Sequence, residues 1–102
     1  MKRGCCPVEK AIKIIGGKWT ILILRDLFTG TKRFGELRKS LIGVSPKTLS
    51  GRLRYLEKEG IVARKVFPEV PPRVEYALTK RGKSLGAIIE SMRRWGEKND
   101  KK

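Results

Sequence analysis

Residues 45–60 carry the side chains best placed for chemistry, because basic and hydroxyl-bearing side chains recur there at helical spacing. At about 100° per residue, one side of a helix collects Lys47, Ser50, Gly51, Arg54 and Lys58. The opposite side collects Leu49, Leu53 and Leu56. Ammonium, guanidinium and hydroxyl groups donate hydrogen bonds to phosphate oxygens and to acceptors on nucleic-acid bases. This pattern therefore favours noncovalent recognition of a polyanion by a helix that its leucines hold in place.

The same segment contains clear signals for where its helix begins and ends. Ser45 can accept hydrogen bonds from the free N–H groups of the first turn, and Pro46 suits the first helical position. Gly60 can adopt the left-handed conformation that ends a helix. We therefore expect a short capped helix between these residues.

The charge of the whole chain also indicates a polyanionic partner. Its 102 residues, enough for one small domain, include 25 Lys and Arg against 10 Asp and Glu, a formal net charge of +15 at pH 7. Binding of phosphates releases counterions and converts such an excess into affinity. Solubility alone needs a net charge of only a few units, so nucleic acid is the favoured partner.

Residue sets for catalysis or metal binding are missing from the sequence. It has no His, and Asp26 and Asp100 are far apart, so we expect no enzyme activity, no metal site and no cofactor. Cys5 and Cys6 are adjacent and indicate no disulfide framework. The longest apolar run, residues 21–24, is far shorter than a membrane span, which predicts a soluble cytoplasmic protein with no membrane partner.

Three helical patterns precede the capped helix. Residues 7–15 have one apolar side, residues 18–28 are apolar nearly all round and predict the centre of the core, and residues 34–42 form a short third helix after a turn at 29–32. A very small turn at residues 42–44 then leads into the capped helix. Two short helices joined in this way are typical of a helix-turn-helix.

After Gly60 the pattern changes to alternation, which predicts two strands within residues 61–78. The prolines between them, in residues 68–72, cannot lie in a central ladder and stiffen an exposed loop, so the hairpin forms a protruding wing. Thr79 can cap a last helix over residues 80–96. Residues 98–102 are expected to form a disordered basic tail.

These elements describe a mainly α-helical fold with a small β-hairpin wing, and five segments resemble one family with that fold. They are Cys-Pro-Val-Glu at 6–9, Ile-Gly-Gly-Lys-Trp at 15–19, Arg-Phe-Gly-Glu-Leu at 33–37, Val-Pro-Pro-Arg-Val-Glu-Tyr-Ala-Leu-Thr at 70–79, and Trp95. In this order they resemble the HxlR-type winged helix-turn-helix transcriptional regulators. The resemblance implies one MarR/HxlR-like domain over residues 1–97, acting as a homodimer on a near-palindromic double-stranded operator.

The expected DNA-binding residues are basic, hydroxyl-bearing or small, and comprise Arg33, Ser45, Lys47, Thr48, Ser50, Gly51, Arg52, Arg54 and Arg73. The capped helix would enter the major groove, Arg33 would touch a backbone phosphate, and Arg73 at the wing would reach a minor groove or a phosphate. Two assignments stay open. Gly51 permits close approach of the backbone to DNA or is tolerated on a solvated face, and Arg52 contacts DNA or pairs with an acidic neighbour, Glu36 or Glu59.

The terminal helices, 7–15 and 80–96, are the expected dimer interface. Their apolar residues at helical spacing are Val8, Ile12, Ile15, Ile88, Ile89, Met92 and Trp95. The alternative is that this surface covers only the monomer's own core.

Cys6 is the one candidate for a reactive side chain. It lies at the expected start of the first helix beside basic residues, where the helix dipole and positive charge favour the thiolate. Some HxlR-type proteins sense redox state through the cysteine that Cys6 matches. The alternative is a small residue that fills space, and the effector, oxidant or small molecule, is unknown.

The strongest alternative is that the chain is a small basic RNA-binding or ribosome-associated protein. The positive charge alone fits that function as well as it fits DNA binding. RNA readers usually stack bases on aromatic side chains, and Tyr55 is the only aromatic residue in the expected groove-binding helix. The helix-turn-helix and wing therefore favour DNA.

Overall fold

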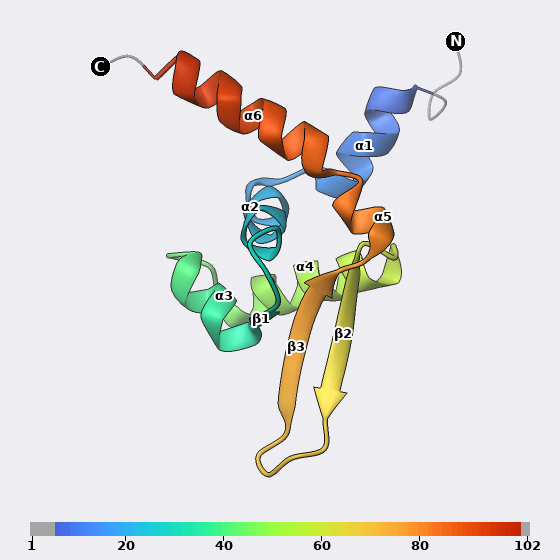
Figure 1. The fold of residues 1–102 in the computed structure, drawn as a ribbon, viewed down its shortest axis with the longest axis vertical. Coiled ribbons are helices and arrows are strands. Elements are labelled where there is room, and N and C mark those ends of the chain that lie inside the picture. The colour runs from blue at the N-terminus through green and yellow to red at the C-terminus, as the bar shows by residue number, and fades with distance from the viewer. Residues whose placement is uncertain (1–5, 101–102) are drawn as a thin grey trace.

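The computed structural model describes residues 6–100. In chain order its elements are α1 (Pro7–Ile15), α2 (Lys18–Leu27), β1 (Lys32–Arg33), α3 (Phe34–Ser40), α4 (Pro46–Lys58), β2 (Val62–Phe67), β3 (Arg73–Leu78), α5 (Lys80–Lys83) and α6 (Gly86–Lys98). Figure 1 shows the β2–β3 hairpin projecting at one end of the molecule and α1 and α6 lying at the other. The mainly helical fold with a hairpin wing is as predicted.

The core forms around α2, whose Ile23 and Leu24 have no exposed surface. The other core side chains come from the end of α2, from α3 and the turn after it, from α4 and from the start of the hairpin, and are Leu27, Leu37, Leu41, Val44, Leu49, Leu53, Leu56, Ile61 and Val62. The nearly all-round apolar pattern of residues 18–28 therefore predicted the central helix correctly, because such a helix must bury more than one side.

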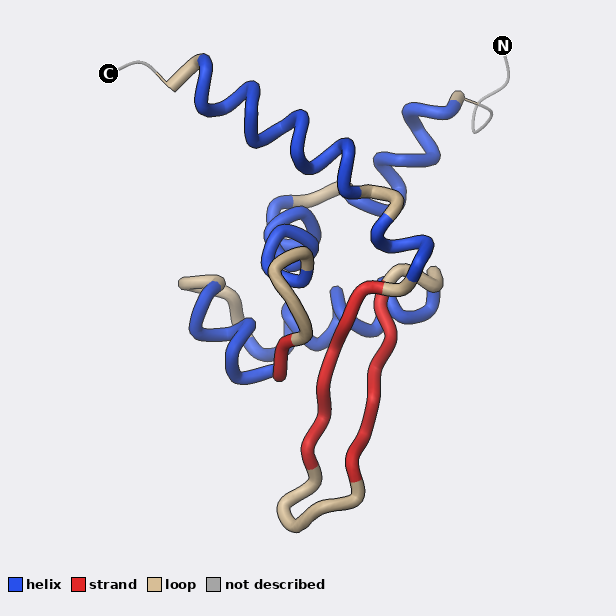
Figure 2. The backbone as a smooth tube through the Cα atoms, viewed as in Figure 1, coloured by secondary structure: helices blue, strands red, loops and turns tan. Residues whose placement is uncertain are grey.

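The sheet has three strands in the order β1-β3-β2, all antiparallel. Figure 2 shows the strands in red beside the blue helices. The two predicted strands pair from Val62 opposite Leu78 to Phe67 opposite Arg73. The two-residue strand β1 was not predicted, since residues 29–32 were expected to form a turn. Two residues are too few to show alternation, and their extended conformation depends on pairing with Tyr76 and Glu75 of β3.

The predicted single helix over residues 80–96 is wrong, because the chain forms two helices there. Thr79 caps α5 as expected, with its hydroxyl accepting from the N–H of Gly82 at 3.0 Å. Gly82 is buried so closely against the hairpin that an added Cβ would lie 2.2 Å from the carbonyl oxygen of Ile61. Packing α5 onto the hairpin base and Leu85 onto the core redirects the chain, and α6 starts at Gly86.

Helix α6 continues to Lys98, and the N–H of Asn99 still bonds to the carbonyl of Trp95 at 3.1 Å. It therefore includes the first residue assigned to the expected tail, whose last two residues, 101 and 102, lie outside the described part of the chain. Among residues 6–100, no helix is both long and apolar enough to cross a membrane.

Candidate nucleic-acid interface

Helix α4 is held by its leucines and begins as the sequence indicated. Leu49, Leu53 and Leu56 are at most 1 % exposed. The Ser45 hydroxyl accepts from the N–H of Thr48 at 3.0 Å, and Gly60 just beyond the helix has a φ of 76°. With one side fixed to the core, the opposite side of α4 must face outward.

The outward side of α4 carries most of the predicted DNA-binding residues. Lys47, Thr48 and Arg54 are exposed, and Ser50 is half-buried. The guanidinium of Arg54 donates to the Ser50 hydroxyl over 3.4 Å, which is a long hydrogen bond. The Ser45 hydroxyl also donates to the Thr48 hydroxyl at 3.0 Å. These two predicted DNA-binding residues are therefore hydrogen-bonded to each other through both the cap and their side chains.

Gly51 and Arg52, whose roles were open, have different surroundings. A Cβ added at Gly51 would meet nothing within 4 Å, so no packing inside the monomer requires glycine there. The guanidinium of Arg52 lies 5.5 Å from the ring centroid of Tyr55 and forms no ion pair with Glu36 or Glu59. Arg52 thus keeps an uncompensated charge at the edge of the interface.

The predicted wing residue Arg73 is already engaged within the wing. Its guanidinium pairs with Glu69 at 2.9 Å and with Glu75 at 3.2 Å, and it stacks 3.8 Å from the ring centroid of Phe67. These contacts neutralise its charge and hold the wing together near its tip. Contact between Arg73 and DNA would require these ion pairs to rearrange.

The sheet carries exposed cations at Arg33 of β1 and at Arg64 and Lys65 of β2. Arg33 is the last residue of β1, and its backbone N–H donates to the Glu36 carboxylate at 2.8 Å. This bond caps the start of α3, and the Arg33 residue itself is exposed to solvent. Arg64 lies on β2 opposite Tyr76 and was missed by the sequence analysis. The alternation of residues 62–67 contained the signal, because it places Arg64 on the same strand face as the buried Val62.

The terminal helices divide the predicted dimer residues into two groups. Ile15 and Ile89 pack against the core, so they serve the monomer. The others are exposed, namely Val8, Ile12, Ile88, Met92 and Trp95, with Trp95 70 % exposed. Neither α1 nor α6 contains a fully buried residue, so each helix leaves part of its apolar side chains exposed in the monomer.

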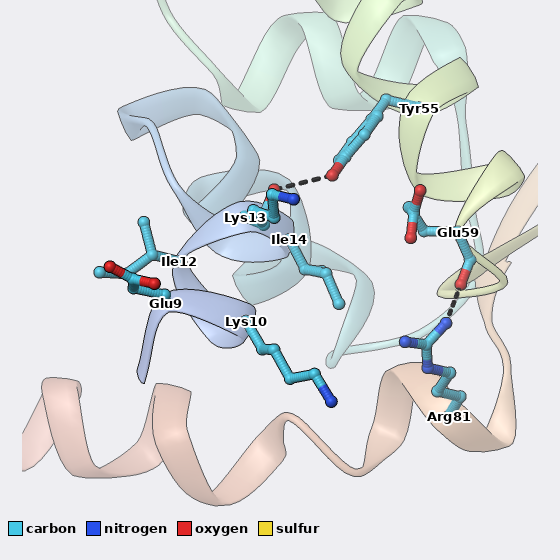
Figure 3. Close-up of a pocket in the computed structure, with 8 residues that line it drawn as sticks. All are labelled: Glu9, Lys10, Ile12, Lys13, Ile14, Tyr55, Glu59 and Arg81. Atoms are coloured by element: carbon cyan, nitrogen blue, oxygen red, sulfur yellow. Dashed lines mark hydrogen bonds between the residues drawn. The ribbon is translucent and has the colours of Figure 1, made fainter. Parts of the chain in front are cut away.

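A cleft of about 880 Å³ separates α1 from the ends of α4 and α5. Figure 3 shows Tyr55 from α4 reaching across to α1, and its hydroxyl donates to the carbonyl of Lys13 at 2.8 Å. Arg81 of α5 donates to the carbonyl of Glu59 at the end of α4 on another side of the cleft. The end of α4 is thereby tied to both terminal regions.

Cys6 is half-buried and occupies the residue just before α1, where its carbonyl accepts from the N–H of Lys10 at 3.2 Å. Cys5 and the basic residues beside it lie outside the described part of the chain. In the described ranges, no group of three His, Cys, Asp or Glu residues could hold a metal ion.

Comparison with known proteins agrees with this architecture. The family model described as HxlR-like helix-turn-helix matches residues 14–102. An HTH-type transcriptional regulator of Synechocystis is 47 % identical over 91 residues, which cover 89 % of this chain and 67 % of that protein.

Two solved structures of redox-related regulators are also similar. The redox regulator HypR in its reduced form has a TM-score of 0.90 and 42 % identity, covering 93 % of this chain and 94 % of that one. Diamide-treated YodB from Bacillus subtilis has a TM-score of 0.77 and 38 % identity, covering 95 % of this chain and 97 % of that one. The predicted winged helix-turn-helix class is confirmed by these neighbours, and the rival RNA-binding class has no support among them.

Proposed function

The chain belongs to the HxlR-like helix-turn-helix family of transcriptional regulators, which are not enzymes, and we propose that it binds operator DNA sequence-specifically as a homodimer. The observation that supports this most is the division of α4 into two sides. One side is completely buried through leucines, and the other presents exposed basic and hydroxyl groups. A helix fixed in this way can enter a major groove without leaving the fold.

The first half of α4 is the base-reading part of the proposal. Lys47 and Ser50 have side chains on the outward side of α4. Gly51 lies on the same side and has no side chain, which leaves room for the helix backbone to approach DNA. Ser45 and Thr48 hold the start of α4 through their hydrogen bonds to each other, and we propose that this end of the helix faces the groove. Arg33 and Arg52 supply positive charge around this surface, where phosphate contacts set orientation without reading sequence.

Homodimerisation is proposed through the exposed apolar sides of α1 and α6. One α4 helix contacts too few base pairs to select an operator, and two-fold repetition places two such helices about 34 to 36 Å apart on one face of DNA. The residues that remain exposed, above all Ile12, Met92 and Trp95, would be covered by a second copy of the chain. Chromosomal operators also imply a cytoplasmic location.

Selection of bound sequences from random duplex DNA tests the function. We expect enrichment of a two-fold symmetric motif, with specific affinity at least about a thousandfold above that for random duplex at the same salt concentration. Sedimentation of the free protein at micromolar concentration should show a dimer. A monomer, or a pool without any enriched motif, would contradict the proposal.

Thiol control of DNA binding is a second, narrower proposal. It rests on the position of half-buried Cys6 at the start of α1 and on similarity to HypR and diamide-treated YodB. Because α1 belongs to the proposed dimer surface, oxidation of Cys6 would change how two chains meet. We expect diamide or peroxide to alter operator affinity in the native protein and not in Cys6→Ser, and indifference of both proteins would exclude sensing.

A further inference from the structure

A polar hollow lies between α4 and the first wing strand β2. It has a volume of about 300 Å³, and its walls comprise Ser50, Arg54, Glu57, Arg64 and Tyr76. That volume is large enough for a phosphate group with part of its hydration shell.

The charge in this hollow is left uncompensated by the rest of the described chain. Arg64 has neither an ion pair nor a side-chain hydrogen bond within residues 6–100, and Arg54 has only its long bond to Ser50. Glu57 is the one acidic wall residue and pairs with neither arginine. The wall thus carries two positive charges and one negative charge, in contrast to the ion-paired Arg73 farther along the wing.

The position of the hollow indicates which anion it meets. In duplex DNA a sugar-phosphate strand separates the major groove from the adjacent minor groove. If α4 lies in a major groove and the wing follows the neighbouring minor groove, the junction between them faces that strand. The hollow occupies this junction, because its walls come from α4 and from the paired residues Arg64 and Tyr76.

We propose that this hollow seats one phosphodiester group of the operator backbone, with Arg64 and Arg54 as its charged donors. The inference rests on the proposed function. A guanidinium matches phosphate oxygens in two-point geometry, and the Ser50 hydroxyl, which accepts from Arg54, keeps its own proton for donation. Arg54 then positions α4 on the backbone, and Lys47 and the Gly51 backbone remain for the base edges.

Glu57 lowers the net charge of the hollow wall from +2 to +1, which one monoanionic phosphodiester balances. The DNA backbone is the proposed source of that diester because the hollow lies where α4 meets the wing, and binding of inorganic phosphate is an outcome of the test.

The test compares Arg64→Ala and Arg64→Lys with Lys65→Ala as matched control. Lys65 is the next residue on β2 and carries the same charge, but its side chain lies on the opposite face of the strand. Binding of the selected operator is titrated between 0.05 and 0.2 M salt. Each chain of the proposed dimer has one seat, so Arg64→Ala should lose about 1.8 from the slope of log affinity against log salt, and its affinity should fall about 12-fold less over this range. Arg64→Lys and Lys65→Ala should keep the native slope.

Base preference gives a second readout. Mismatch penalties at each operator position should stay within about twofold of native in Arg64→Ala, because a phosphate contact carries no sequence information. Three outcomes would each contradict the proposed phosphate site. They are an unchanged salt slope in Arg64→Ala, an equal loss of slope in Lys65→Ala, and a change of Arg64→Ala base preference at one operator position.

Two arms separate failure of the seat from other outcomes. Saturable binding of inorganic phosphate below millimolar concentration, lost in Arg64→Ala without a change in DNA slope, would make the hollow a free-anion site and overturn the proposal. A native protein that enriches no motif overturns the proposed function, and the slope comparison on random duplex DNA then still decides the seat. Arg64 is exposed, and thermal melts of the variants verify that they fold.

Discussion

The hydroxyl of Tyr55 on α4 donates to the backbone carbonyl of Lys13 on α1 over 2.8 Å, joining residues 42 positions apart. This bond links the helix proposed to enter DNA with a helix proposed to form the dimer. The bond crosses the cleft of Figure 3, so α1 and the C-terminal half of α4 are in direct contact there.

Tyr55→Phe removes this hydrogen bond and keeps the ring. We expect the free energy of unfolding to fall by about 1 kcal/mol, since a net intramolecular hydrogen bond contributes that much. Urea denaturation measures the loss. Tyr76→Phe is the matched control, because the Tyr76 hydroxyl has no hydrogen bond within residues 6–100, and its unfolding free energy should change by less than about 0.5 kcal/mol. Equal losses in both variants would show that the Tyr55 bond adds nothing.

Gly51→Ala separates the two explanations of a glycine within α4. Nothing lies within 4 Å of the added Cβ, so helix propensity should raise the unfolding free energy by up to about 1 kcal/mol. If the backbone approaches DNA closely at Gly51, the stabilised variant will bind its operator more weakly. Gly96→Ala in α6, also open within 4 Å, is the control for propensity without DNA contact. Undiminished operator binding by Gly51→Ala would favour the solvated-face explanation.

Trp95→Ala tests the dimer surface. Trp95 is 70 % exposed in the monomer, so truncation should leave monomer folding nearly intact. If a second copy covers it, the dimer should weaken by about 2 kcal/mol or more, which is roughly thirtyfold in its dissociation constant. Sedimentation equilibrium measures this. Ile42→Ala, at an 87 % exposed apolar residue before α4, should leave dimerisation unchanged, and equal effects at both positions would argue against this surface.

Acid should weaken α6 in a defined range of pH. Hydrogen bonds from Arg93, with further contributions from Arg94, lower the pKa of Glu90 from 4.5 to about 2, although burial opposes the shift. A carboxyl group whose pKa is lower in the folded state stabilises fully above its unfolded pKa. That contribution is present above about pH 4.5 and is lost as the pH falls toward 2.

Circular dichroism during acid titration measures this effect. Native protein should lose more helical signal between pH 4.5 and 2 than Glu90→Gln does. The difference should shrink in 1 M salt, because Glu90 is exposed to solvent and its ion pairs are screened. Glu57→Gln, at a carboxylate without an ion pair in the described chain, should titrate like the native protein. Superimposable native and Glu90→Gln curves would contradict this prediction.

The elements of the fold were predictable wherever one local pattern decided them. Periodic leucines and a serine cap defined α4, and the prolines of residues 68–72 defined the hairpin loop. The prediction failed where contacts distant in sequence decided the conformation. Strand β1 exists through its pairing with β3, and α5 is separated from α6 because Gly82 packs directly on the Ile61 backbone.

The candidate site divides in the same way. Sequence by itself determined which side of α4 is basic and which is apolar, because helical periodicity alone orders side chains around a helix axis. Only the tertiary structure decided which charges remain available to DNA. Arg73 is neutralised by Glu69 of the hairpin loop and by Glu75 of its own strand, because the hairpin turns back near its tip. Arg64 of β2 faces a hollow shared with Arg54 of α4, because folding brings these two like charges together from separate elements.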